Sequence, residues 1–146
     1  MKVFRAAIVL LGLTTSVHAI AQVPGESAFV EHRLALQLSD MGEDKQTQVL
    51  NVANNALKAY GPDKVAIDVV AFGPGVDLLR EGNKNAERIS SLIAQGVRFD
   101  VCMNTVDTIE RNTGKPYPLN PQAHPVEAGI ARIMTLAEHG YIAVRP

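Results

Sequence analysis

The chain has 146 residues, 47% of them apolar, and its 14 basic and 15 acidic residues leave a formal net charge of −1. The basic residues are interspersed with acidic ones, so there is no cationic stretch that could neutralise a nucleic-acid backbone. Tryptophan is absent and aromatic residues make up only 5%, which argues against a stacking platform for bases. We therefore expect no nucleic-acid partner.

The N-terminus has the pattern of a secretory signal peptide. Lys2 and Arg5 precede an apolar run over residues 6–13, and small residues offer cleavage after Ala19 or Ala21. The run is shorter than the ~20 apolar residues that a membrane-spanning helix needs, so we expect no membrane anchor after cleavage. We expect residues 1–21 to be removed and residues 22–146 to form one periplasmic or secreted domain, with a net charge of about −3.

Apolar periodicity in the first half predicts two strands joined by a helix. Leucine alternates with other residues between His32 and Asp40, which is typical of a strand. The segment from Lys45 to Tyr60 repeats apolar residues at helical spacing, and Gly61 followed by Pro62 predicts where this helix ends. The segment 65–72 is nearly continuous in apolar, largely β-branched residues, which indicates a strand covered on both faces of a parallel sheet.

The second half continues the alternation of helices and strands. The pattern predicts a short helical segment (Val76 to Arg80), a helix closed by Gly96 (Ala86 to Ile93), a strand (Arg98 to Met103), a short helix (Thr105 to Arg111), a proline-rich loop (Gly114 to Pro125), a helix from about Pro125 to Glu138 and a last strand (Tyr141 to Val144). The order predicts a three-layer α/β/α domain with a mainly parallel sheet of four to five strands and right-handed crossovers.

Three strand ends are expected to converge into one site, because ligands bind beyond the carboxyl ends of parallel strands. They are Ser39-Asp40, Gly73-Pro74-Gly75 and the segment 102–105. Gly73-Pro74-Gly75 lets the backbone approach an anion closely, but it lacks the full G-x-G-x-x-G run of a dinucleotide site. The alternative is a structural strand-to-helix turn in which glycine supplies unusual dihedral angles.

Cys102 is the only cysteine, and it lies where a strand is predicted to end and a helix to begin. Asn104 or Thr105 is a candidate N-cap for that helix, and a thiol before the first turn of a helix has its pKa lowered. The alternative is that Cys102 is a small buried hydrophobe in the core. The chain has no C-x-x-C pair, no metal-ligand spacing and no Cys-His-Asn spacing, so we expect no dithiol exchange, no metal and no cofactor.

Four segments together resemble the DsrE/DsrF-like family: Leu36 to Asp40, Asn51 to Leu57, Val69 to Leu79 and Gly96 to Thr105. The resemblance covers nearly the whole chain after the signal peptide. It implies a Rossmann-like three-layer domain that assembles into homo-oligomers, often trimers or hexamers. It also implies sulfur trafficking, in which a cysteine after a central strand accepts sulfane sulfur as a persulfide and passes it to a partner protein. Cys102 matches that position.

The leading hypothesis is an exported sulfur carrier or sulfurtransferase with Cys102 as the catalytic residue. Gly73, Pro74, Gly75, Asn104 and Thr105 would shape an anion-tolerant pocket beside the thiol, and the sulfur donor and acceptor are unspecified. One alternative is a non-enzymatic small-anion-binding or assembly module with Cys102 as core packing. Another is a thiol redox sensor that forms a disulfide between subunits.

Overall fold

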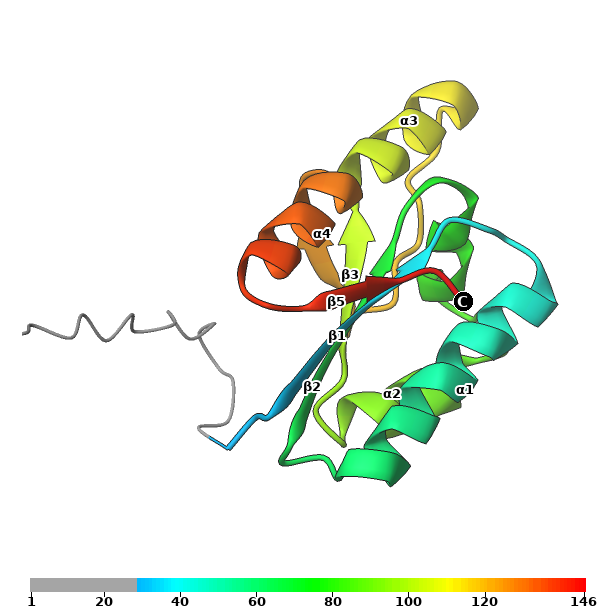
Figure 1. Ribbon diagram of the computed structural model, residues 1–146. Coiled ribbons are helices and arrows are strands. Elements are labelled where there is room, and N and C mark those ends of the chain that lie inside the picture. Colours follow the sequence, from blue (N-terminus) through cyan, green and yellow to red (C-terminus); the bar gives the residue numbers. More distant parts are fainter. Residues whose placement is uncertain (1–28) are drawn as a thin grey trace, which may run out of the picture.

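Five parallel strands form one sheet in the computed structural model, which describes residues 29–146 (Figure 1). The predicted signal peptide over residues 1–21 lies outside the described residues. The strands have the order β4-β3-β2-β1-β5, and each neighbouring pair is parallel. They are β1 (His32–Leu38), β2 (Val65–Ala71), β3 (Arg98–Cys102), β4 (His124–Val126) and β5 (Ile142–Val144). The predicted α/β fold with a parallel sheet is confirmed.

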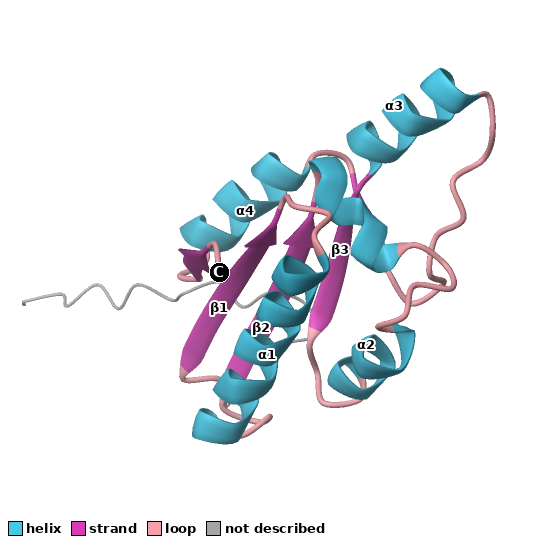
Figure 2. Ribbon diagram, turned by 90° about the vertical axis from the view of Figure 1, so that its right-hand side faces the viewer, coloured by secondary structure: helices cyan, strands magenta, loops and turns pink. Residues whose placement is uncertain are grey.

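Helices cover both faces of this sheet. Helices α1 (Glu43–Tyr60) and α2 (Ala86–Ile93) lie on one face, and α4 (Gly129–Glu138) lies on the other (Figure 2). A 3-10 helix, η1 (Gly73–Leu79), follows β2. Helix α3 (Met103–Thr113) follows β3 and extends beyond the carboxyl end of that strand (Figure 1). The result is three layers, α/β/α.

Alternating side chains of β2 enter two separate cores, which is why its sequence is apolar except for Asp68. Ile67 and Val69 belong to the larger core, together with Leu50 of α1. Val70 belongs to the smaller core, together with Leu136 of α4. Because successive side chains of a strand point to opposite faces, odd-numbered residues of β2 and β3 face α1 and α2, and even-numbered residues face α4. Asp68, Asp100 and Cys102 therefore lie on the face that α4 covers.

Helix α1 ends where the sequence predicts. Gly61 adopts φ +87° and donates its backbone N–H to the Leu57 carbonyl at 2.8 Å, which closes the last turn. Glycine reaches this positive φ without the steric cost that a side chain would carry. At its other end α1 begins at Glu43, two residues before the predicted Lys45. Its first turn carries two acidic residues, whose negative charge interacts favourably with the helix dipole. Within residues 29–146, no helix combines the length and the apolar character needed to cross a membrane.

The predicted boundaries after residue 113 are wrong in one respect. The last helix does not start near Pro125, because His124–Val126 forms the edge strand β4, and α4 starts at Gly129. Pro125 is tolerated in β4 because an edge strand pairs on one side only, and among the described strands β4 pairs only with β3. The later start of α4 matters for the site described next, because it places the first residue of that helix beside the end of β3.

Helix α3 also starts earlier than predicted, directly at Met103. The N-cap position is therefore Cys102 itself, with extended backbone angles (φ −73°, ψ 109°), and not Asn104 or Thr105. Both of these residues lie within the first turn of α3. The strand passes into the helix with no intervening loop, so the Cys102 thiol is held between two regular elements.

Candidate functional site

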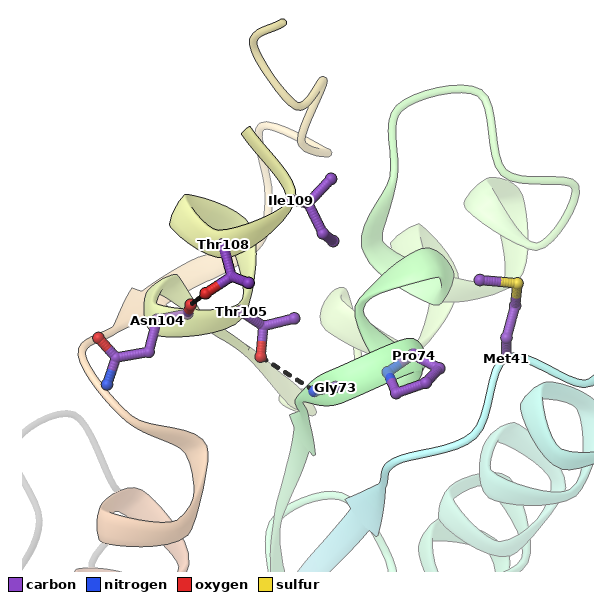
Figure 3. Close-up of a pocket in the computed structure, with 7 residues that line it drawn as sticks. All are labelled: Met41, Gly73, Pro74, Asn104, Thr105, Thr108 and Ile109. Atoms are coloured by element: carbon purple, nitrogen blue, oxygen red, sulfur yellow. Dashed lines mark hydrogen bonds between the residues drawn. The ribbon is translucent and has the colours of Figure 1, made fainter. Parts of the chain in front are cut away.

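A pocket of about 520 Å³ opens where β2 and β3 end and where the chain leaves β1 (Figure 3). Four of the predicted binding residues line it, namely Gly73, Pro74, Asn104 and Thr105, together with Met41, Thr108 and Ile109. No charged side chain is among these lining residues. The predicted convergence of strand ends is therefore present, with Met41 in place of Ser39-Asp40.

A hydrogen bond joins the two main walls of the pocket. The Gly73 backbone N–H donates to the Thr105 hydroxyl oxygen at 3.0 Å, which ties the start of η1 to the first turn of α3 (Figure 3). Gly73 has φ +52°, a conformation that favours glycine. On the α3 wall of the pocket, Thr108 donates its hydroxyl to the Asn104 carbonyl at 2.7 Å (Figure 3). These bonds fix the wall of the pocket nearest to Cys102.

Gly75, unlike the other predicted binding residues, lies away from the pocket surface. It is buried and is not among the residues that line the pocket. A Cβ atom on Gly75 would lie 2.2 Å from the Leu38 carbonyl oxygen, at the end of β1. The absence of a side chain at Gly75 thus allows η1 to pack directly on the backbone of β1.

Cys102 is nearly covered, with 5% of its surface exposed, and it does not line the pocket itself. Its thiol is within 3.9 Å of the Glu127 carbonyl oxygen, to which it donates. The same carbonyl accepts the Asn104 backbone N–H at 3.1 Å. Thr105 lies between the thiol and the pocket, because its hydroxyl contacts both Cys102 and Gly73.

The Cys102 thiol lies at the N-termini of two helices. Burial opposes its ionisation, but the Thr105 hydroxyl and the backbone N–H groups of Gly129, Thr105 and Asn104 favour the thiolate, and together they lower the pKa of Cys102. Two of these N–H groups belong to the first turn of α3, and the third is that of the first residue of α4. Backbone N–H groups at a helix N-terminus favour a negative charge.

The contribution of α4 could not be found from local sequence, because Glu127 and Gly129 are far from Cys102 along the chain. Gly129 packs closely against Phe72 because it has no side chain. A Cβ atom there would lie 2.9 Å from the Phe72 side chain. A glycine immediately before the apolar pattern of a helix is the one signal that could have indicated this close approach.

Four charged side chains form a cluster on the α4 face of the sheet, next to the thiol. Arg132 of α4 donates to Asp100 at 2.6 Å and to Asp68 at 3.0 Å. Arg98 donates to Asp100 at 2.7 Å and lies 3.7 Å from Asp68. Both carboxylates are buried, and the Asp68 Oδ1 atom accepts no hydrogen bond from any of residues 29–146. We call these four residues the Arg132 cluster, which was not predicted from the sequence.

Burial and the neighbouring Asp100 carboxylate raise the pKa of Asp68 to about 7, against the opposing effect of Arg132 and Arg98. The side chain therefore changes charge near neutral pH. Arg132 keeps its charge, because the attraction of the two carboxylates outweighs the effect of its burial and raises its pKa further. Among residues 29–146 no group of three or more His, Cys, Asp or Glu side chains is arranged to hold a metal ion.

One solved structure with a similar fold belongs to a protein of unknown function. The structure is similar to that of MTH1491, a protein of unknown function from Methanobacterium thermoautotrophicum, with a TM-score of 0.70 and 26% sequence identity over 80% of this chain and 100% of that one. No family model matches the chain. No curated protein matches it either. The likeness supports a single Rossmann-like α/β domain.

Proposed function

We propose that this protein carries sulfane sulfur as a persulfide on Cys102, as expected of a DsrE/DsrF-like protein. The observation that supports this most is the environment of the thiol: two helix N-termini and the Thr105 hydroxyl favour its anionic form. A thiolate is the nucleophile in sulfur exchange, and a persulfide on the same residue is also anionic near neutral pH. The same N–H groups therefore serve both the empty and the loaded carrier.

The proposed reaction is an exchange with no net oxidation. The Cys102 thiolate attacks the outer sulfur of a donor persulfide or polysulfide, a new S–S bond forms at Sγ, and the donor's own S–S bond breaks so that a thiolate leaves with the electron pair. In the second step an acceptor thiolate attacks the outer sulfur, and Cys102 leaves as the thiolate. The uncharged pocket beyond Thr105 gives space for the donor and the acceptor.

Export and assembly belong to the same proposal. The signal-peptide pattern of residues 1–21 supports a location in the periplasm or outside the cell. Exposed apolar side chains on α4 (Ile130 and Met134) and on β5 (Ile142 and Val144) support a homo-oligomer, because a solvated monomer gains nothing from exposing them. Sedimentation of the mature protein separates a trimer or hexamer from a monomer, and a monomer would contradict the assembly.

Intact-mass spectrometry tests the proposed sulfur loading. Reduced mature protein is incubated with polysulfide, beside Cys102→Ser, and both are measured before and after dithiothreitol. We expect the native protein to gain whole sulfur atoms that dithiothreitol removes, and Cys102→Ser to gain none. A native protein that gains no sulfur, while the same protein gains sulfur in denaturant, would contradict the proposal.

The second candidate is a small-anion-binding or assembly module in which Cys102 only packs the interior. The 5% exposure of Cys102 favours this function. The two candidates predict opposite results for a bulky alkylating reagent. A carrier thiol is labelled in the folded protein, whereas a packed thiol is labelled only after unfolding.

A further inference from the structure

The Arg132 cluster has no part in the sulfur exchange described above, although it lies beside the thiol. Arg132 is the member that joins two layers: it comes from α4, and the two carboxylates that it binds come from β2 and β3. Its side chain is 17% exposed, so its two short contacts are largely shielded from water. Hydrogen bonds from one guanidinium to two buried acidic side chains add geometric specificity to the packing of a helix.

Both ends of this link are next to the thiol contacts. Asp100 is two residues before Cys102 on β3, so the two side chains are neighbours on the same face of the sheet. Arg132 is three residues after Gly129 on α4, which is about one helical turn. Fixing the position of Arg132 therefore also restricts the position of Gly129.

We propose that Arg132 is a positioning residue: by binding Asp68 and Asp100, it holds the N-terminus of α4 against the Cys102 thiol. This inference rests on the proposed role of Cys102 as an anionic sulfur carrier, and it adds how the thiolate site is assembled. In this arrangement α3 supplies its N–H groups by direct continuation from β3, whereas the N-terminus of α4 is positioned by the Arg132 link in addition to the apolar packing of that helix.

If the cluster only stabilised the fold, loss of Arg98 and loss of Arg132 would have similar effects, because Arg98 lies near the same two carboxylates. Arg98 lies on β3 and is 41% exposed, and it makes no link to α4 among the described contacts. Loss of either arginine removes one cation from the two carboxylates, but only loss of Arg132 removes a contact between this cluster and α4. Arg98→Met is therefore a matched control for Arg132→Met.

The test is titration of the single thiol by its thiolate absorbance at 240 nm, with Cys102→Ser as the blank. We expect Arg132→Met to raise the pKa of Cys102 by about one unit, because the thiolate loses the Gly129 N–H. We expect Arg98→Met to leave it unchanged. Circular dichroism establishes that each variant is folded. An equal change in the two variants, or none in either, would overturn the proposal.

A third variant covers the case in which Arg132→Met does not fold, since it leaves two buried carboxylates without their main cation. Asp68→Asn/Asp100→Asn/Arg132→Met removes the charges together, and we expect the same rise in the pKa of Cys102. An unchanged pKa in this folded variant would also contradict the proposal. The titration needs no sulfur donor, so the expected rise in the pKa of Cys102 can be observed even if sulfur loading fails. If sulfur loading succeeds and the pKa does not rise, only the role of Arg132 is rejected.

Discussion

Replacing Gly75 by alanine is expected to lower the free energy of unfolding by about 3 kcal/mol or more. The added Cβ atom would lie 2.2 Å from the Leu38 carbonyl oxygen and 2.7 Å from its carbonyl carbon. These are backbone atoms of β1, so no side-chain rotation can relieve the clash. Either η1 must move away from β1 or the end of the strand must shift, and both changes would disturb the pocket wall formed by Gly73 and Pro74. Urea unfolding of the two proteins measures the difference.

Gly42→Ala is the matched control for this substitution. Gly42 has an ordinary φ of −56°, and a Cβ atom there would meet no other atom within 4 Å. Because Gly42 is the N-cap of α1, where alanine is less favourable than glycine, we expect a loss below about 1 kcal/mol. Equal unfolding midpoints for Gly75→Ala and Gly42→Ala would show that the close packing of η1 on β1 is not what Gly75 provides.

The stability of the folded protein is expected to fall by about 2 kcal/mol between pH 5 and pH 7 on account of Asp68. Its pKa is about 7 in the folded protein, because of burial and the nearby Asp100. In the unfolded chain an aspartate has a pKa of about 4. Between these two values the folded state retains a proton that the unfolded state has lost. This contribution to stability is therefore complete below about pH 4 and is lost as the pH rises through 7.

Thermal or urea unfolding across this pH range, with Asp68→Asn alongside, isolates the effect. All other titrating groups are common to the two proteins, so the difference between their pH profiles belongs to Asp68 and to its interaction with Asp100. We expect the profile of Asp68→Asn to be flatter between pH 5 and pH 7. Parallel profiles would mean that Asp68 is ionised throughout and that the two arginines outweigh its burial.

The strand and helix order could be predicted from sequence because each element carries its own pattern. The nearly continuous apolar run 65–72 is typical of a strand covered on both faces, and Gly61-Pro62 is typical of the end of a helix. The same reasoning placed Cys102 at the end of a strand and Gly73, Pro74, Asn104 and Thr105 near it. These predictions depend on residues that are adjacent in sequence, or on the rule that parallel strands end at one edge of the sheet.

The parts that could not be predicted depend on contacts between distant residues. The N–H group of Gly129 and the carbonyl of Glu127 reach Cys102 only because α4 starts after the edge strand β4, and the proline-rich segment hid that strand. The role of Gly75 likewise depends on its distance to β1 and not on its neighbours in sequence.

The Arg132 cluster left one trace in the sequence. Asp68 is the single charged residue within an otherwise apolar strand, and a carboxylate at such a position needs a partner. Which arginine supplies that partner could not be deduced, because Arg132 follows 64 residues later on another layer. A charged residue inside a buried strand thus predicts that a partner exists without identifying it.

Release of the sulfur tests the proposed carrier role of Cys102 most directly, because a sulfur carrier must both accept sulfur and deliver it. Protein loaded with polysulfide and freed of excess reagent is mixed with a low-molecular-weight thiol, and intact masses of the protein and the thiol are followed together. We expect Cys102 to lose its added sulfur while the thiol gains the same amount as a persulfide. Sulfur that stays on the folded protein, or that leaves without appearing on the thiol, would contradict a carrier function.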